Sequence, residues 1–179
     1  MKVLLLINIL SAYSTFVADG INDVPPHYAD FLGGRFTLLG ETASFQIHIE
    51  RLYQNYSGPV YIFIDSDGDT STGWTNTGYI SEDEFPLLGA DLLLIINQLN
   101  PERSTLYALS SSGSYTFSSY VTCERVFTTP TRVRFSGRIY SIQSSLIHIQ
   151  LMINEEGNWG DLLPDRGAIS LQNQKITQK

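Results

Sequence analysis

An acidic loop is the part of the sequence in which residue types and spacing best suit a chemical role. Asp65, Asp67 and Asp69 stand at alternate positions directly after the apolar run Val60–Ile64. Three neighbouring carboxylates repel one another unless a cation neutralises them, and carboxylate oxygens are ligands that Ca²⁺ prefers. We therefore predict a Ca²⁺ site formed by these three aspartates. Asp91, from the next apolar segment, is either a fourth oxygen ligand or only a hydrogen-bond partner for the backbone at the start of a strand.

The acidic loop departs from the EF-hand pattern. Counted from Asp65, the sixth residue is Thr70 where that motif has Gly, and the twelfth is Asn76 where it has Glu. Gly68 still permits a tight curl of the backbone, and the absence of an adjacent His or Cys favours Ca²⁺ over a transition metal. The sequence leaves one alternative open, a metal-free turn in which Asp and Gly cap exposed backbone N–H groups.

Aromatic side chains near this loop could bind a ligand. Sugar rings stack on aromatic faces, while a few polar groups fix their hydroxyls. We predict Trp74, Tyr79 and Trp159 as ligand-binding residues, with Trp159 in a turn at 155–161. The alternative is that both tryptophans are partly buried lids on the core.

A basic stripe is expected on the segment Val133–Ile142. Alternation places Val133, Phe135 and Ile139 on one face of a strand. The opposite face carries basic and aromatic side chains, namely Arg132, Arg134, Arg138 and Tyr140. That content suits an acidic glycan or a neighbouring subunit, and a plain solvated sheet face is the alternative.

Known catalytic patterns are absent from the chain. It has no nucleophile elbow, zinc-protease motif, P-loop or dinucleotide-binding motif, so we predict no catalytic residues and no enzyme activity. His148 and Met152 would lie about 13 Å apart on one strand face, too far to hold one haem iron between them. Cys123 stands alone and cannot form an intramolecular disulfide.

Composition narrows the class of protein. The 179 residues include 11 Lys and Arg against 18 Asp and Glu, which gives a formal net charge of -7. An acidic chain lacks the positive field that nucleic-acid binding requires, so nucleic acid is excluded as the main partner. With 42% hydrophobic residues, the chain can bury the core of one domain.

The first residues have the layout of a signal peptide. One positive charge at Lys2 precedes the apolar run Val3–Leu10, and small or polar residues follow. We predict a signal peptide over residues 1–18, a mature domain over 19–179 and a secreted or cell-surface location. The alternative is an N-terminal buried strand, and no other segment reaches the roughly 20 apolar residues of a membrane span.

Hydrophobic periodicity predicts strands throughout the mature chain. Phe45–Glu50 alternates apolar and polar residues, whereas Val60–Ile64 and Leu92–Ile96 are continuously apolar and should be covered on both faces. Ser110–Ser114 separates two strand segments and predicts a hairpin. Roughly eight evenly spaced strands predict an all-β, single-domain antiparallel β-sandwich of jelly-roll-like form.

The acidic loop also carries a resemblance. Val60–Trp74 followed by Gly89–Ile95 resembles the strand, DxD, STG-aromatic and GAD-strand signature of exported prokaryotic β-sandwiches related to family-nine carbohydrate-binding modules and DOMON domains. Weaker likenesses occur at Tyr28–Gly34 and Leu163–Ile169. The resemblance implies a jelly-roll-like sandwich on an exported or surface protein, with calcium and sugar binding widespread in the group and haem binding in some DOMON members.

These observations predict a secreted or cell-surface binding module with a structural Ca²⁺ in the acidic loop and carbohydrate or other surface proteins as partners. The main alternative is a structural subunit of an extracellular filament or surface layer, assembled by pairing of edge strands. A small glycan hydrolase or a haem-binding redox domain is the third possibility.

Overall fold

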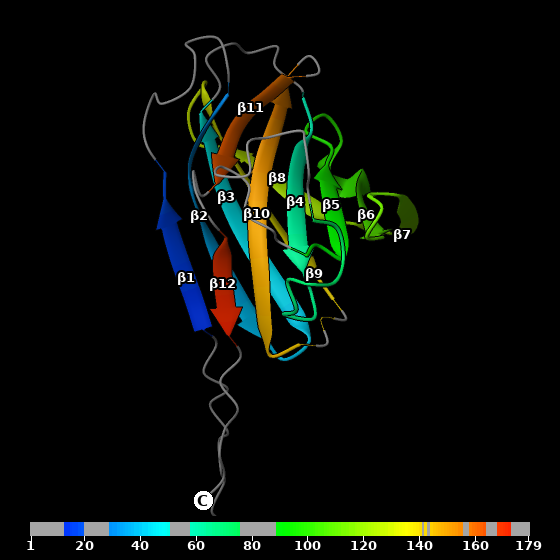
Figure 1. The fold of residues 1–179 in the computed structure, drawn as a ribbon. Helices are drawn as coiled ribbons and strands as arrows, with labels where there is room; N and C mark the ends of the chain where they lie inside the picture. Colours follow the sequence, from blue (N-terminus) through cyan, green and yellow to red (C-terminus); the bar gives the residue numbers. More distant parts are fainter. Residues whose placement is uncertain are drawn as a thin grey trace, which may run out of the picture.

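In the part of the chain that the structure describes, the secondary structure consists of strands and one 3₁₀ turn (Figure 1). The computed structural model describes residues 13–19, 29–50, 58–75, 89–140, 142, 144–155, 158–163 and 168–172. Their elements are β1 (Tyr13–Ala18), β2 (Asp30–Leu39), β3 (Thr42–Glu50), β4 (Val60–Asp65), β5 (Leu92–Ile96), η1 (Pro101–Arg103), β6 (Ser104–Leu109), β7 (Tyr115–Val121), β8 (Cys123–Phe127), β9 (Arg132–Ile139), β10 (Leu146–Glu155), β11 (Asn158–Leu163) and β12 (Ile169–Gln172).

The strands form two antiparallel sheets. The first, sheet A, has the order β1-β2-β3-β9-β8, and the second, sheet B, has the order β11-β10-β4-β5-β6-β7. β12 also belongs to sheet B, because it pairs with the first residues of β10 while β11 pairs with the last. The chain crosses between the sheets after β3, after β7 and after β9. The predicted all-β antiparallel sandwich is thereby confirmed.

The core between the sheets follows the period of two that strands impose. In β3, Ala43, Phe45, Ile47 and Ile49 are buried, and the residues between them are partly exposed. β10 likewise turns alternate isoleucine and leucine side chains of Ile147–Ile153 into this core. Burial of each such side chain stabilises the fold by roughly 1.5–3 kcal/mol.

A second apolar cluster lies on the outer face of sheet B. Phe63, Leu93 and Met152 are buried there with Ala90, and Trp74 packs against them. β4 and β5 are therefore covered on both faces, as their continuous apolar sequences predict. The acidic loop begins beside this cluster, because Asp65 is the last residue of β4.

Three strands were not predicted from the sequence. β1 comprises residues that the sequence assigns to a signal peptide, and it pairs with β2 from Tyr13 opposite Leu38 to Ala18 opposite Gly33. β8 is an edge strand, and its charged residues Glu124 and Arg125 interrupt the alternation of apolar and polar residues that would predict a strand. β11 corrects the expected turn at 155–161, since Glu155 pairs with Asn158 and residues 158–163 continue as a strand. Signal cleavage and the secreted location remain predictions.

Among the described residues, no helix has the length and apolar character needed to cross a membrane.

Candidate functional site

The acidic loop is fastened to the outer cluster at both of its ends. Trp74 forms an isolated bridge with Ala90, in which Trp74 N donates to Ala90 O at 2.8 Å and Ala90 N to Trp74 O at 3.0 Å. Asp91 N donates to Ile64 O at 2.9 Å. These bonds place Asp91, which precedes β5, beside Asp65 at the end of β4.

Three carboxylates meet at this junction. Asp65, Asp67 and Asp91 each offer one oxygen, and these oxygens lie within 4.8 Å of one another. Asp65 is fully buried, Asp91 is partly exposed and Asp67 is exposed. Because Ca²⁺ holds oxygens at about 2.3–2.6 Å, two ligands of one ion lie up to about 5 Å apart. We call these residues the acidic cluster, and its spacing fits one hard cation.

Hydrogen bonds orient the two better buried carboxylates. Asp65 Oδ1 accepts from Gly68 N at 2.7 Å, and Gly68 has the positive φ of 74° that a tight curl requires. Asp91 Oδ2 accepts from both the backbone N (3.0 Å) and the Oγ (3.1 Å) of Ser66. The loop thus shows the backbone capping of the alternative interpretation and also presents a converged set of oxygens.

The two exposed aspartates of the loop, Asp67 and Asp69, have different hydrogen-bond partners. Asp67 Oδ1 accepts from Asp69 N at 2.8 Å, and its Oδ2 accepts from Thr72 Oγ1 at 2.9 Å. Asp69 accepts from Ser71 N and Ser71 Oγ instead, and these bonds lower the pKa of its carboxyl. Asp69, which the sequence proposes as a ligand, therefore lies outside the acidic cluster and caps the next turn.

His148 joins the acidic cluster from β10. Its Nδ1 lies 2.8 Å from Asp65 Oδ2, because the register of β4 and β10 sets the two residues opposite each other. Burial raises the pKa of Asp65, the hydrogen bonds from His148 and Gly68 oppose that rise, and contact with Asp67 adds to it. A bound cation would stabilise the ionised carboxylate. The two partners are 83 residues apart, so no sequence pattern signals the contact.

Trp74 acts as a lid on the sheet. Its ring lies 5.3 Å from that of Phe63 at an interplanar angle of 31°, and its side chain is partly buried. A Cβ atom at Gly113 would lie 2.8 Å from Trp74 Nε1, so the β6–β7 turn closes over the indole. This position agrees with the lid alternative. Tyr79 lies outside the described residues, and Trp159 is placed only by its backbone in β11.

Aromatic rings continue from Trp74 across the outer face of sheet B. We call this row the aromatic band; its members are Trp74, Phe63, Tyr61, Tyr115, Tyr107, Phe117 and Tyr120. The contacting pairs of rings in the band have centroids 5.1–6.3 Å apart. The pKa of Tyr61 is raised first by burial and then by Tyr115, which connects the two halves of the band electrostatically. The sequence alone did not connect these residues, because they come from three strands and a loop.

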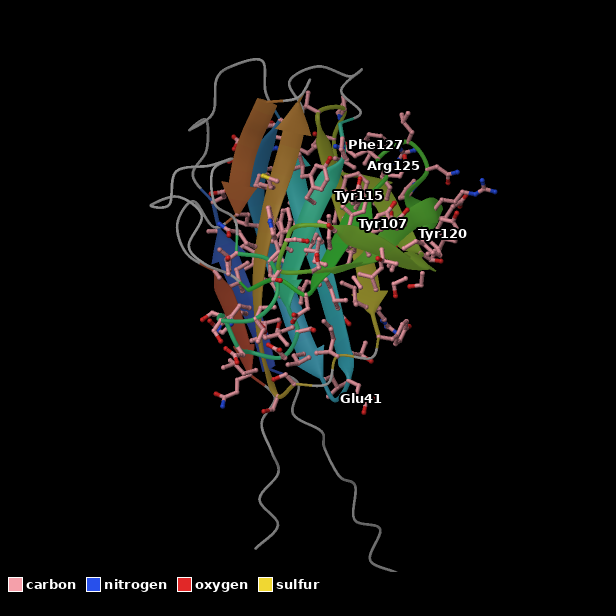
Figure 2. The ribbon with its side chains drawn as sticks, turned by 45° about the vertical axis from the view of Figure 1, so that its right-hand side comes forward. Glu41, Tyr107, Tyr115, Tyr120, Arg125 and Phe127 are labelled. Atoms are coloured by element: carbon pink, nitrogen blue, oxygen red, sulfur yellow. The ribbon has the colours of Figure 1, made fainter. Side chains whose placement is uncertain are left out.

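The far end of the aromatic band is open to solvent. Tyr115, Phe117 and Tyr120 on β7 are 63%, 53% and 68% exposed. Figure 2 shows Tyr107, Tyr115 and Tyr120 gathered on β6 and β7 at the edge of the sheet. Exposed aromatic clusters of this kind mark interaction surfaces on folded proteins.

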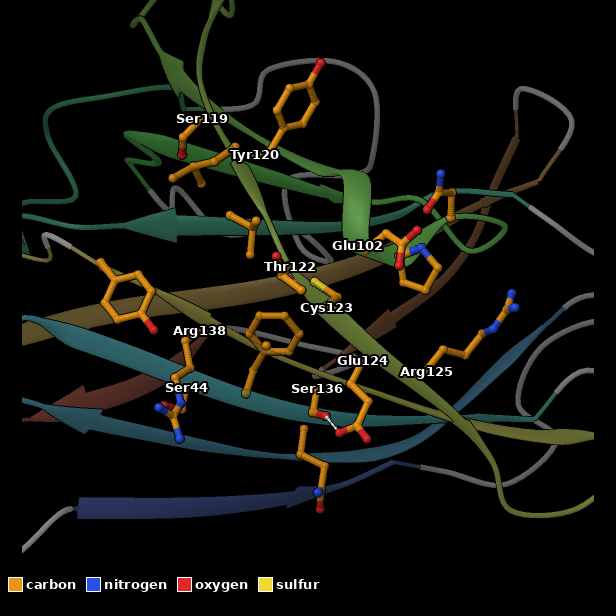
Figure 3. A pocket seen from close by; sticks show the side chains of 18 of the residues that line it. Ser44, Glu102, Ser119, Tyr120, Thr122, Cys123, Glu124, Arg125, Ser136 and Arg138 are labelled. Atoms are coloured by element: carbon orange, nitrogen blue, oxygen red, sulfur yellow. Dashed lines mark hydrogen bonds between the residues drawn. The ribbon is translucent and has the colours of Figure 1, made fainter.

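An open groove of about 1340 Å³ lies beside the corner where β7 passes into β8. Figure 3 shows side chains from both sheets around it, including Tyr120, Cys123 and Arg138. Burial raises the pKa of the Cys123 thiol, which makes it a poor nucleophile at neutral pH. Polar and apolar residues line the groove together.

No family model, curated protein or solved structure matches this chain.

Proposed function

We propose that this protein is a secreted or cell-surface binding module whose acidic loop is ordered by Ca²⁺ and whose aromatic band binds a carbohydrate. One observation carries the proposal: the loop that brings Asp65, Asp67 and Asp91 within 4.8 Å also packs Trp74 onto Phe63 of the band. A cation in the acidic cluster would therefore stabilise one end of the ligand surface.

The cation has a structural role in this proposal. The three carboxylates come from the end of β4, the loop and the start of β5, so one ion would join both ends of the loop. A bound ion would relieve their mutual repulsion. The residues would hold Ca²⁺ by carboxylate oxygens, and no catalytic step follows from it.

The carbohydrate assignment rests on the open end of the aromatic band. Tyr115–Val121 contains no charged residue, and its tyrosines offer ring faces together with hydroxyl groups. Apolar faces of pyranose rings pack on such side chains, and phenolic hydroxyls bond to the sugar. This surface replaces the predicted platform at Trp74, whose ring is partly covered.

The binding module is tested on metal-free protein prepared with a chelator. Added Ca²⁺ should raise the melting temperature of the parent and should have little effect on Asp67→Asn. Asp69→Asn is the matched control, because Asp69 lies on the same loop outside the acidic cluster. An unchanged melting temperature in the parent refutes the metal site.

The ligand surface is tested separately on an array of neutral glycans. Retention should be lost in Phe117→Ala and Tyr120→Ala and kept in Tyr140→Ala, an equally exposed aromatic residue outside the band. Equal losses in all three variants would refute the assignment of the band.

A filament subunit is the second candidate, favoured by the edge position of β7. Among the described strands β7 pairs only with β6, and it carries no charge to block a neighbouring strand. A register shift between Leu106 and Tyr107 opposes this reading, because an irregular edge pairs poorly. Fibres whose formation depends on β7 would favour the filament over the binding module.

A further inference from the structure

The outer face of sheet A concentrates positive charge on an acidic protein. Six arginines lie in the described part of the chain, and four of them share this face. We call it the arginine face; its basic residues are Arg35, Arg132, Arg134 and Arg138. β9 turns Val133 and Phe135 into the core, so the arginines on that strand point outward, as the sequence predicts.

Most of this positive charge is uncompensated. Glu50 pairs with Arg132, at 3.1 Å from Oε1 to Nε, and this is the only arginine–carboxylate ion pair among the described residues. Glu124 on the neighbouring strand β8 accepts a hydrogen bond from Ser136 Oγ at 3.4 Å through its Oε2. Within the described residues, three guanidinium groups of the arginine face are therefore left without an acidic partner.

The environment of His48 supports an excess of positive charge here. His48 lies opposite Arg134 in the register of β3 and β9. The pKa of its imidazole is lowered, first by burial and then by the charge of Arg134. This effect of Arg134 agrees with a positively charged surface around His48.

The register spreads the three unpaired charges over a flat surface. Arg138 lies opposite Ser44, and Arg35 lies opposite Gln46, which in turn lies opposite Ser136. Strand geometry then puts the Cα atoms of the three arginines roughly 12–13 Å apart, with neutral hydrogen-bonding side chains between them. A ligand that fits is extended, less densely charged than nucleic acid and rich in hydroxyl groups.

Nucleic acid does not meet this description. Duplex DNA carries one charge per about 1.7 Å of its axis, and binding it requires a denser set of cations than three widely spaced arginines. A polysaccharide with carboxylate groups has both features, since its carboxylates can accept bidentate bonds from Arg and its hydroxyls can bond to Ser and Gln side chains.

We infer that the arginine face binds a carboxylate-bearing polysaccharide. Figure 3 shows Arg138 and Ser44 on adjacent strands at the groove, with the bond between Ser136 and Glu124 nearby. This site lies on the sheet opposite the aromatic band, so the inference does not depend on the proposed function.

Polygalacturonate tests the inference, with uncharged dextran as the comparison polymer. In low-salt buffer the parent should bind polygalacturonate and not dextran, and affinity should fall as salt is raised. The double variant Arg134→Gln/Arg138→Gln should bind at least about tenfold more weakly, the equivalent of one charge-assisted bond. Arg103→Gln, on η1 and exposed, is the matched control and should bind as the parent does.

A second variant keeps the test decisive. Arg35→Gln changes an exposed residue on β2, so it should fold as the parent does and still bind more weakly. The inference is overturned if the parent does not bind polygalacturonate, if both face variants bind as the parent does, or if Arg103→Gln loses as much affinity. The protein could instead self-associate, with the arginine face of one copy binding the acidic cluster of a second copy. Self-association that is lost both in the arginine variants and in Asp67→Asn would show this and would also overturn the inference.

Discussion

Replacing Asp91 should loosen the acidic loop even without metal. Its Oδ2 accepts two hydrogen bonds from Ser66, which closes 25 residues of chain between β4 and β5. A bond to a charged group contributes about 1.5–3 kcal/mol when buried, and the partial exposure of Asp91 reduces this. We therefore expect Asp91→Ala to lower the free energy of unfolding by about 2 kcal/mol in chelator.

The size of the change can be checked by melting. For a chain of this length, about 2 kcal/mol corresponds to a fall of roughly 4–8 °C in melting temperature. Asp91→Asn keeps an oxygen that can accept from Ser66 N, so its loss should be about half as large. Ser66→Ala removes only the hydroxyl donor, and the double variant Ser66→Ala/Asp91→Ala should show less than the sum of the single losses.

Added Ca²⁺ separates the structural and metal-binding roles of Asp91. At a hundredfold excess over its dissociation constant, a bound ion stabilises the parent by about 2.7 kcal/mol. Asp91→Ala and Asp91→Asn should both gain much less, because each removes one carboxylate from the acidic cluster. A difference of 1 °C is roughly a sixth of the expected shift. If Asp91→Ala melts within about 1 °C of the parent in both chelator and Ca²⁺, Asp91 does not stabilise the junction between β4 and β5.

Three further outcomes follow from the same geometry. The pKa of the Asp65 carboxyl is raised above 3.8, so the folded state binds the carboxyl proton more tightly than the unfolded state does. In chelator, the parent should therefore gain the full stabilisation relative to Asp65→Asn below pH 3.8 and should lose it as the pH rises through the folded pKa. Denaturation of both proteins at several pH values measures this difference. Gly113→Ala should cost about 1–3 kcal/mol and alter the fluorescence of Trp74, because Gly113 has φ 78° and its Cβ would meet the indole. Phe63→Ala should cost about 3–5 kcal/mol in urea unfolding, whereas the exposed Phe117→Ala should cost less than about 1 kcal/mol; similar losses would contradict the assigned burial.

Local pattern was enough to predict the architecture. β5 has the bounds that its apolar run indicates, and β3 and β9 bury the faces that alternation assigns to the core. These features follow from the two-residue period of a strand, which neighbours in sequence determine. β1, β8 and β11 were not predicted because each lies at the edge of a sheet, and an edge strand needs little apolar content and takes its conformation from its partner.

The composition of the acidic loop was likewise readable in the sequence, while its ligand geometry was not. Asp69 is only two residues from Asp67 yet accepts from Ser71, whereas the pairing of β4 and β5 brings Asp91 to Ser66, 25 residues away in the sequence. His148 reaches Asp65 only through the register of β10 with β4. Side chains from different strands meet only if those strands pair in the right register. Strand pairing and register depend on the burial of the sheet faces over the whole chain, so a local sequence pattern does not reveal them.

The same division holds for the two proposed surfaces. The sequence by itself determined that β9 has a basic face and that β7 has uncharged aromatic residues. Only the tertiary structure added Arg35 to the first surface and joined Tyr107 and Tyr61 to the second, because strand order sets which residues become neighbours across a sheet.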